Sequence, residues 1–204
     1  MFMKIFAEKE AEKFLKKEGF EIVEGVFVSS KIGIKGALIK LGLPCVMKVF
    51  GKKILHKHKV GGVKLNIKTY SEALGVFTSL KRIKGSQGVL IQKKFSGKEF
   101  LLGIKKTPEF AHVLVFGAGG SKVEEKKDVS FRVCPVDKRD MRAMIKETKI
   151  GKRLPKKTFE ILFENLSKLC ELVERHPTIS ELDINPMNIS KKAGKIIDAR
   201  IVFE

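Results

Sequence analysis

The chain has 204 residues, of which 43% are hydrophobic and 32% are charged, and its formal net charge is +19 at pH 7. This balance is typical of a globular protein with one substantial domain or two small lobes, and it excludes a disordered chain. No apolar run approaches the roughly 20 residues that cross a bilayer, and the N-terminus lacks the apolar core of a secretory signal. We therefore expect a cytoplasmic protein without a membrane partner.

The positive charge raises the question of a nucleic-acid partner. Of the 42 basic residues only seven are arginine, and the lysines are spread along the whole chain without a basic tail. Arginine is the preferred side chain for forked contacts to bases and phosphates, and aromatic rings stack on unpaired bases. With one tyrosine and no tryptophan, the composition favours a lysine-biased surface, with local basic lining around a phosphate site, over a nucleic-acid-binding module.

The three cysteines, Cys45, Cys134 and Cys170, are far apart in the sequence, and no C-x-x-C pair is present. The spacing therefore indicates neither a thiolate zinc site nor a redox motif. Each cysteine lies among apolar residues, so we interpret all three as small buried hydrophobes in a reducing compartment.

The apolar periodicity predicts helices and strands without strict alternation, which indicates an α+β (mixed α/β) architecture. The glycine-punctuated stretch near residues 84–88 is the expected boundary between lobes 1–86 and 87–204. In chain order the expected elements are a helix over 7–17, a strand over 22–29, a glycine-containing stretch, strands over 45–50 and 63–67, a helix capped by Ser71, strands over 88–95, 99–104, 112–116 and 129–136, a helix begun by Asp137, a helix over 158–175, and a closing hairpin of strands 179–189 and 195–203.

Lys48 stands in the middle of the apolar strand Cys45-Val-Met-Lys-Val-Phe50. Val46 and Phe50 share its face of the strand, so Lys48 points towards an apolar or enclosed space. A buried ammonium group is costly unless an anion offsets its charge, and phosphate is the leading functional partner. The alternative, a lysine on the wet face of an edge strand, is about equally compatible with the residues alone.

A glycine tract, Phe116-Gly-Ala-Gly-Gly-Ser121, follows a further predicted strand. Gly117, Gly119 and Gly120 allow backbone N–H groups to turn towards an anion. The tract is not a Walker A loop and does not match the dinucleotide fingerprint. By itself such a sequence is more often a simple turn.

The closing hairpin carries the strongest chemical pattern. Asp183 and Asn185 are two residues apart and therefore share a face of their strand. If the turn is centred near 192–193, Asn185 lies opposite Arg200 and diagonal to Asp198, within side-chain reach. A carboxylate and an amide oxygen from adjacent strands suit Mg²⁺, which takes few protein ligands when phosphates complete its shell. We therefore favour a metal site here over the ordinary use of Asp and Asn at turns.

His56 lies in Ile54-Leu-His-Lys-His-Lys-Val-Gly-Gly62, between two predicted strands. Its ring could carry or relay a phosphoryl group. The alternative is an ordinary loop histidine in a basic stretch. No Ser/His/Asp arrangement or Gly-x-Ser-x-Gly motif is readable in the sequence.

Seven motifs occur in one order along the chain: Lys48, Ile54-Leu-His-Lys57 with Val60-Gly-Gly-Val63, Val89-Leu-Ile-Gln-Lys-Lys94, Gly97-Lys-Glu99, Phe116-Gly-Ala-Gly-Gly120, Asp128-Val-Ser-Phe-Arg-Val133, and Glu181-Leu-Asp-Ile-Asn-Pro186 with Asp198-Ala-Arg200. Together they resemble the ATP-grasp β subunit of ADP-forming acetyl-CoA synthetase and, more distantly, the β subunit of succinyl-CoA synthetase. The resemblance covers about residues 5–204. It implies an ATP-grasp fold, in which two α+β lobes hold ATP between them.

The resemblance also implies an activity and a partner. The family interconverts acyl-CoA, ADP and phosphate with acid, CoA and ATP. An α subunit supplies the CoA site and a phosphohistidine, which passes phosphate to ADP. The resemblance also implies a role for individual residues. In the nucleotide site, Lys48 would bind the phosphates, Gln92 and Lys93 would belong to the adenine hinge, and Glu99 would lie near the nucleotide together with Gly117, Gly119 and Gly120. Asn185 and Asp198 would hold Mg²⁺, Asp183 would meet the incoming phosphohistidine, and His56 matches a second histidine that relays phosphate.

Three other functions stay open at this stage. His58-Lys59 and Gly51-Lys52-Lys53 depart from the residues that usually surround the relay histidine, which is compatible with a degenerate nucleotide-binding regulatory partner. A different ATP-grasp carboxylate ligase would need its own acceptor site, for which 204 residues leave little room. A basic nucleic-acid-binding module is the least favoured.

Overall fold

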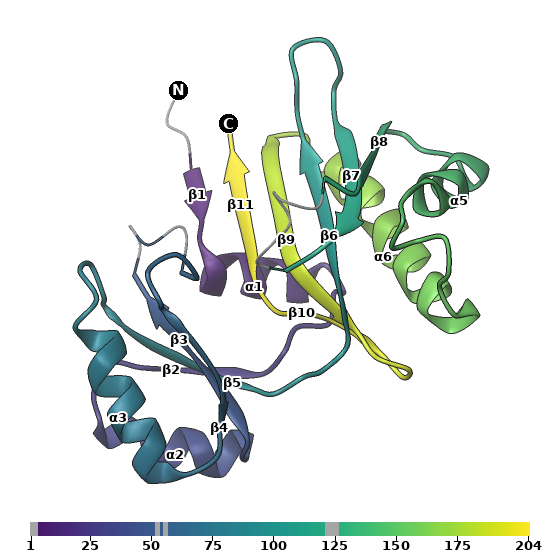
Figure 1. Cartoon of the computed structure of the whole chain (residues 1–204). Coiled ribbons are helices and arrows are strands. Elements are labelled where there is room, and N and C mark those ends of the chain that lie inside the picture. Colours follow the sequence, from purple (N-terminus) through teal and green to yellow (C-terminus); the bar gives the residue numbers. More distant parts are fainter. Residues whose placement is uncertain (1–3, 52–53, 55–56, 121–126) are drawn as a thin grey trace. The chain divides into compact units, whose positions relative to one another are not determined.

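The computed structural model describes residues 4–51, 54, 57–120 and 127–204. The chain divides into two compact units, Met1–Ile22 with Ser96–Glu204, and Val23–Phe95 (Figure 1). This division differs from the expected lobes 1–86 and 87–204, because strand pairing decides it. β5 (Gly88–Lys93) completes the sheet of the smaller unit, and β1 (Lys4–Phe6) pairs with the last strand of the larger unit, β11 (Ala199–Phe203).

The larger unit is built on a sheet of seven described strands. The central strand is β9 (Ile179–Ile189), which pairs with β6 on one side and with β10 and β11 on the other. All these pairings are antiparallel. The strand order is β1-β11-β9-β6-β7-β8, and β10 also pairs with β9. The remaining strands of this sheet are β6 (Lys98–Lys105), β7 (Val113–Ala118), β8 (Val129–Val133) and β10 (Gly194–Ile196).

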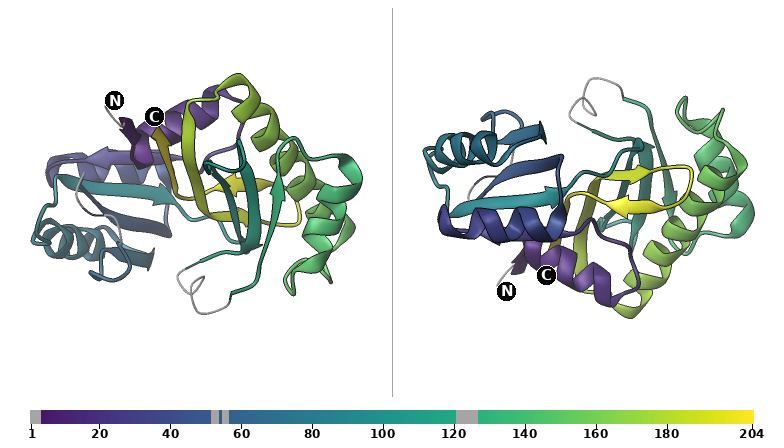
Figure 2. Two further views of the ribbon diagram at one scale, coloured as in Figure 1. Left: turned by 90° about the horizontal axis from the view of Figure 1, so that it is seen from above. Right: turned by 90° about the horizontal axis from the view of Figure 1, so that it is seen from below.

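Three helices pack their apolar sides against one face of this sheet: α1 (Glu8–Lys17), α5 (Lys138–Glu147) and α6 (Lys156–Arg175) (Figure 2). The longest, α6, places leucines at helical spacing in the core, and its ends agree with the expected helix within two residues. Asp137 caps α5 as expected, because its carboxylate accepts the N–H of Asp140 over 2.8 Å. The fully buried residues of α6 are Leu162, Leu166, Leu169 and Leu172.

The smaller unit has a four-stranded antiparallel sheet in the order β2-β5-β3-β4, where β2 is Gly25–Val28, β3 is Cys45–Phe50 and β4 is Val63–Ile67. Helices α2 (Ile32–Leu41) and α3 (Tyr70–Lys81) cover one face of it (Figure 1). Successive side chains of each strand point alternately towards these helices and towards the opposite face of the sheet. Cys45, Met47 and Val49 from β3 and Val89 and Ile91 from β5 fill the core beneath the helices.

Two local expectations were wrong. The glycine-containing stretch forms helix α2, whose buried side chains Ile34, Leu38 and Leu41 have helical spacing. The signal was weak because Lys31 at the N-cap makes no side-chain hydrogen bond and glycines lie inside the helix. Helix α3 is capped by Thr69 and not by Ser71, since the Thr69 hydroxyl accepts the N–H of Glu72.

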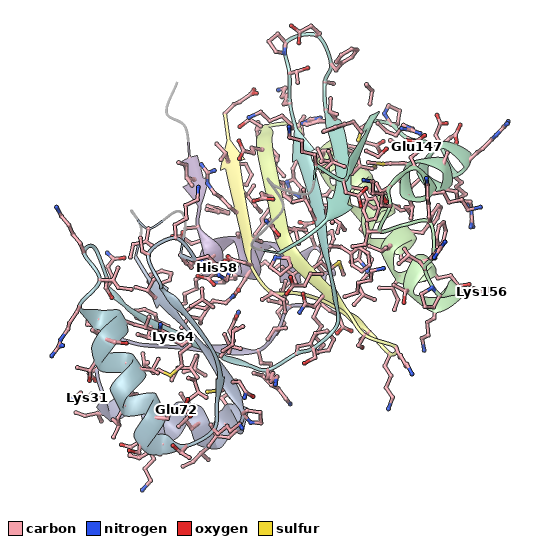
Figure 3. The ribbon with its side chains drawn as sticks, viewed as in Figure 1. Lys31, His58, Lys64, Glu72, Glu147 and Lys156 are labelled. Carbon is pink, nitrogen blue, oxygen red and sulfur yellow. The ribbon has the colours of Figure 1, made fainter. Side chains whose placement is uncertain are left out.

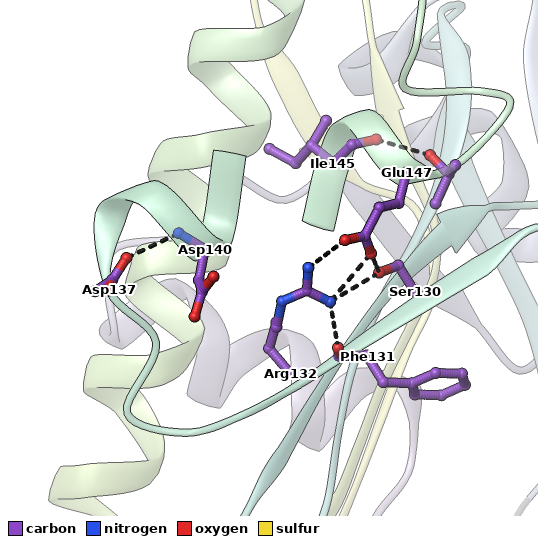
Figure 4. A network of polar contacts seen from close by, with 8 residues as sticks. Ser130, Phe131, Arg132, Asp137, Asp140, Ile145 and Glu147 are labelled. Atoms are coloured by element: carbon purple, nitrogen blue, oxygen red, sulfur yellow. Dashed lines mark hydrogen bonds and ion pairs between the residues drawn. The ribbon is translucent and has the colours of Figure 1, made fainter. Parts of the chain in front are cut away.

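A network of polar contacts joins β8 to α5 (Figure 4). Arg132 donates two hydrogen bonds to the carboxylate of Glu147, and Ser130 Oγ donates a third over 2.7 Å. These bonds lower the pKa of Glu147, with Arg132 as the main cause. Asp128 accepts the N–H groups of Lys149 and Ile150 over 2.7 and 2.8 Å. The motif over residues 128–133 therefore holds α5 and the segment that follows it.

The surface charge is dispersed over elements from both units. Figure 3 labels Lys31, Lys64 and Lys156, which belong to three different segments, and all three side chains are exposed. In the part of the chain that the structure describes, no helix has the length and hydropathy to span a membrane.

Helix α2 offers a matched test of the fold, because Ile34 is fully buried and Ile39 is 77% exposed on the same helix. We expect Ile34→Ala to lower the free energy of unfolding by about 2–5 kcal/mol, since it leaves a cavity in the core. Ile39→Ala should change it by less than about 0.5 kcal/mol. Urea denaturation of both variants checks this, and equal losses would contradict the placement of α2.

Candidate functional site

Lys48 lies in the interior of the smaller sheet. Its strand, β3, pairs with β4 on one side and β5 on the other, and Lys48 is opposite both Val63 and Leu90. The residue is only 4% exposed. The interpretation of Lys48 as a wet lysine on an edge strand is therefore wrong, and its interpretation as an enclosed ammonium group is confirmed.

Lys48 and Gln92 share the face of the sheet that α2 and α3 leave uncovered. Gln92 on β5 is directly opposite Val46, and Val46 is two residues before Lys48. Lys48 and Gln92 are therefore diagonal neighbours on one face. Gln92 is 1% exposed, and Leu90, which lies opposite Lys48 on the same face, is 7% exposed. The arrangement combines one positive charge, one amide and apolar neighbours, which suits an anion attached to a planar group with hydrogen-bonding edges.

Lys93 lies on the opposite face from Gln92, because successive residues of a strand alternate. Its side chain is exposed, and its backbone N–H donates to Glu24 O over 2.9 Å. Of the two residues that resemble an adenine hinge, only Gln92 thus places its side chain beside Lys48.

In the larger unit, the register of the hairpin differs from the expected one by two residues. Arg200 lies opposite Asp183, and not opposite Asn185. The reason is the position of the turn. Ser190 donates its N–H to Ala193 O over 2.9 Å, and its hydroxyl accepts the N–H of Ala193 over 3.1 Å. These bonds centre the turn between residues 191 and 192, and the whole register follows.

This register brings Asn185 and Asp198 directly across from each other. The N–H of Asn185 donates to Asp198 O over 3.1 Å. Both strands are irregular at this pair of residues. In a regular strand, residues buried on one face are two positions apart, but the buried residues on either side of this pair are three positions apart. Those flanking residues are Ile184 and Met187 on one strand, and Ile196 and Ala199 on the other. The irregular step therefore presents an amide and a carboxylate together.

The glycine tract fixes the side chain of Asn185. Gly120 donates its N–H to Asn185 Oδ1 over 2.9 Å, and Gly119 donates to Glu99 O over 3.1 Å. Gly120 has a φ of +96°, and a Cβ added there would collide with the carboxylate of Glu99. A Cβ on Gly119 would come within 2.5 Å of the Phe100 backbone. These N–H groups thus bond within the protein, and the glycines allow the chain to approach Glu99 and Asn185.

Gly117 has a different neighbour, since a Cβ there would collide with the backbone oxygen of Asp128, the residue before β8. Glycine is therefore required at this position for close packing of β7 on its neighbouring strand.

Asp183 lies on the same face of β9, opposite Gly103 of β6 and Arg200 of β11. Burial raises its pKa to about 6, and the negative charges of Asp198 and Glu181 add to the increase, while Arg200 opposes it. Arg200 also donates to Glu181 over 3.2 Å. The confirmed alternation, with Leu182 and Ile184 buried in the core, places Asp183 and Asn185 on the face away from the helices.

Asn185 and Asp198 fit a hard cation. Both offer oxygen atoms, and the bond from Gly120 identifies the Asn185 oxygen while leaving it a second lone pair. Among the described residues, no group of three or more His, Cys, Asp or Glu residues is arranged to hold a metal ion. Mg²⁺ usually binds through only one or two protein oxygens.

His56 lies outside the described residues. The turn after it is described: Gly62 donates its N–H to Lys57 O over 2.7 Å, and His58 is exposed in this turn (Figure 3). The relay role of His56 stays a prediction from the sequence.

A protein-family profile described as an ATP-grasp domain matches residues 3–203. The chain belongs to the ATP-grasp family. Its fold, with mixed helices and antiparallel sheets, is that of the family, as the sequence predicted.

Curated relatives define the branch of the ATP-grasp family. The chain is 37% identical over 204 residues to acetate–CoA ligase [ADP-forming] II of Archaeoglobus fulgidus, covering 97% of this chain and 30% of that protein. It is 34% identical over 210 residues to acetate–CoA ligase [ADP-forming] I subunit beta of Pyrococcus furiosus, covering 96% of this chain and 90% of that subunit. The chain thus spans about a third of the first relative and nearly all of the second.

A solved ATP-grasp structure has the same fold. The dinucleotide-forming acetyl-coenzyme A synthetase 1 of Ca. Korarchaeum cryptofilum, in complex with coenzyme A, Ca-AMPCP and HgCl⁺, superimposes with a TM-score of 0.88 at 29% identity, covering 98% of this chain and 94% of that chain. A second structure of that synthetase holds coenzyme A and Mg-AMPPCP, with its phosphohistidine segment pointing towards the nucleotide binding site, and has a TM-score of 0.81 at 29% identity, covering 98% and 93%.

Sequence reasoning missed Arg200 as the neighbour of Asp183. The signal was present in the turn, because a serine at the start of a tight turn can bond its own backbone three residues on. Counting the register from Ser190 would have paired residues 183 and 200.

Gly120 tests the close approach of the chain to Glu99. We expect Gly120→Ala to lower the free energy of unfolding by about 1–2 kcal/mol through its left-handed backbone, and by somewhat more because the exposed Glu99 side chain must move away from the new methyl group. Gly19→Ala is the matched control, since Gly19 has a φ of +83° but nothing within 4 Å, and should cost about 1 kcal/mol. Combining Gly120→Ala with Glu99→Ala should recover part of the loss in urea denaturation. An additive pair would contradict the predicted collision.

Asp183 predicts a pH dependence of stability in metal-free protein. Its pKa in the folded state, about 6, exceeds the ordinary value of 3.8, so the folded state holds the proton more tightly. The group therefore favours folding fully below pH 4 and loses that contribution as the pH rises through 6. Relative to Asp183→Asn, the wild type should lose on the order of 3 kcal/mol between pH 4 and 7. Urea denaturation with a chelator measures this; a constant difference would contradict it.

Proposed function

We propose that this chain is the nucleotide-binding subunit of an ADP-forming acyl-CoA synthetase and catalyses, with a partner subunit, the interconversion of acyl-CoA, ADP and phosphate with acid, CoA and ATP. Support comes from the match to nearly the whole Pyrococcus β subunit, which carries that activity in its name. The word "subunit" in that name also supports a separate partner chain for this protein, and we propose that this α subunit provides the CoA site and a phosphohistidine.

In this proposal the smaller unit binds the nucleotide through Lys48 and Gln92. The buried ammonium group of Lys48 neutralises phosphate oxygens, because an enclosed cation interacts strongly with an anion. Gln92 offers donor and acceptor atoms to the edge of the base, and its apolar neighbours Val46 and Leu90 contact the ring. We further propose that Glu99 and the tract of Gly117, Gly119 and Gly120 border the nucleotide, the glycines by positioning Glu99 and Asn185.

The larger unit supplies the metal ligands. Asn185 and Asp198 would hold Mg²⁺, which when bound balances the charge of the transferring phosphoryl group. Asn185 is fixed for this task by two hydrogen bonds, one accepted by its side chain and one donated by its backbone. The observation that carries the proposal is this pairing of Asn185 with Asp198 at the irregular step of the hairpin.

Asp183 would receive the phosphohistidine of the α subunit. Its carboxylate can accept a hydrogen bond from an imidazole N–H, which orients the ring. Arg200 lies opposite Asp183 and lowers its pKa against the effect of burial, so it favours the ionised form that accepts such a bond. His56 would relay phosphate, as its position in the sequence motif implies.

Lys48→Met tests nucleotide binding with little change in side-chain volume. We expect it to weaken Mg-ATP binding by about 10- to 100-fold, because a charged hydrogen bond is lost. Lys64→Met is the matched control: Lys64 is on the adjacent strand and exposed (Figure 3), and its loss removes the same charge. Isothermal titration calorimetry measures both. Equal affinities in the two variants, or no binding by the wild type, would contradict the proposal.

The activity is tested by mixing the chain with a candidate α subunit, acetyl-CoA, ADP, phosphate and Mg²⁺ and measuring ATP. We expect ATP only when both subunits are present. His56→Ala should abolish turnover and leave nucleotide binding unchanged, and His58→Ala is the neighbouring control that should retain turnover. Full turnover by His56→Ala would refute the relay, and nucleotide binding without turnover in any pairing would favour a regulatory role.

A further inference from the structure

Two cysteines that are distant in the sequence meet in the larger unit. Cys134 Sγ and Cys170 Sγ are 3.3 Å apart, although 36 residues separate them along the chain. Cys134 directly follows β8, and Cys170 lies on the core side of α6. The interpretation of the cysteines as small buried hydrophobes is confirmed for Cys45 and Cys170, which are buried free thiols, whereas Cys134 is only partly buried. Cys45, in the smaller unit, is fully buried.

The two thiols differ in access. Cys134 is partly exposed and lines a cavity of about 380 Å³ on the larger unit, whereas Cys170 is 7% exposed and is not among the lining residues. The other side chains around the cavity include Lys106, His112 and Glu174. Of the two cysteines, only Cys134 therefore forms part of the wall that a small molecule in the cavity would contact.

The pKa values of the two thiols also differ, and the more accessible cysteine has the lower pKa. Contact with Cys170 lowers the pKa of the Cys134 thiol, against the opposing effects of burial and of Glu174. The same contact, together with burial, raises the pKa of Cys170. Cys134 therefore ionises first, and Cys170 can donate its S–H to the Cys134 thiolate. The thiolate is the nucleophilic form of a cysteine.

We infer that Cys134 and Cys170 form a modification site, in which a low-molecular-weight disulfide entering the cavity oxidises the pair to an intramolecular disulfide. The inference is independent of the proposed nucleotide chemistry. A metal site at the same place is not supported, because no third His, Cys, Asp or Glu completes a cluster among the described residues.

The exchange proceeds in two balanced steps. The Cys134 thiolate attacks one sulfur of the small disulfide, whose S–S bond breaks and releases one thiolate, leaving a mixed disulfide on Cys134. Cys170 then gives its proton to water and attacks the Cys134 sulfur, which expels the second thiolate. The protein loses two thiol hydrogens and the small disulfide becomes two thiols. Bonded sulfurs are about 2.05 Å apart, so the pair must approach by roughly 1.3 Å.

The bond would join the end of β8 to α6 across the segment that contains α5. Cys134 is held on the β8 side because its N–H donates to His112 O over 2.8 Å. Closing this loop restricts the unfolded chain, so the oxidised protein should be the more stable form.

The test equilibrates the whole chain with oxidised glutathione or with oxidised dithiothreitol, then counts thiols in denaturant and maps peptides by mass spectrometry. We expect the wild type to fall from three thiols to one, with a Cys134–Cys170 link, and Cys45→Ala to form the same link. The melting temperature of the oxidised wild type should rise by about 10 °C relative to the reduced form. Retention of three thiols, or a link that involves Cys45, would overturn the inference.

Single variants test the order of attack. Cys170→Ser should trap glutathione on Cys134, because the thiol that resolves the mixed disulfide is missing. Cys134→Ser should react with glutathione disulfide at least tenfold more slowly than Cys170→Ser, because the thiol that it retains, Cys170, is buried. The reverse order of reactivity would contradict the role of the cavity. Since the wild-type measurement needs no substitution, poor folding of a variant leaves the main test intact.

Discussion

The hydrogen bonds around Asn185 are the constraint on which the candidate site depends. Its N–H donates to Asp198 O, and its side-chain oxygen accepts the N–H of Gly120. The first bond needs the irregular step in the hairpin, and the second needs a glycine whose backbone can lie against Glu99. The closing hairpin and the glycine tract, which are distant in the sequence, thus meet at one residue. The central position of β9 in the sheet makes this possible, because it has neighbours on both sides.

The smaller unit has to accommodate a buried charged side chain. A lysine in the middle of a sheet is costly to bury unless an anion or a polar partner offsets the charge. The sheet gives one face to a hydrophobic core under α2 and α3, and the other face carries Lys48 and Gln92. The alternation of strand residues therefore separates the hydrophobic core from the face that we propose binds the nucleotide, so that this face can hold polar groups without weakening the core.

The sequence predicted most of the architecture because its signals were local. An apolar run interrupted only by Lys48 located β3, and Asp137 marked the start of α5. Helix α2 was missed since its glycines and its weak N-cap conceal an apolar spacing that only packing makes decisive. The partner of Arg200 was missed although the local bonds of Ser190 determine it. The partner of Cys134 could not be read, because the meeting of β8 with α6 depends on tertiary contacts. The relevant residue types were visible in the sequence, and their neighbours were not.

The most direct test of the account is a crystal structure of the chain with Mn²⁺ and a non-hydrolysable ATP analogue, with the metal located by its anomalous scattering. We expect one peak bonded to Asn185 Oδ1, to the carboxylate of Asp198 and to phosphate oxygens, with Lys48 also bound to the phosphates. A metal bound to the nucleotide without either Asn185 or Asp198, or a nucleotide that does not contact Lys48, would contradict it.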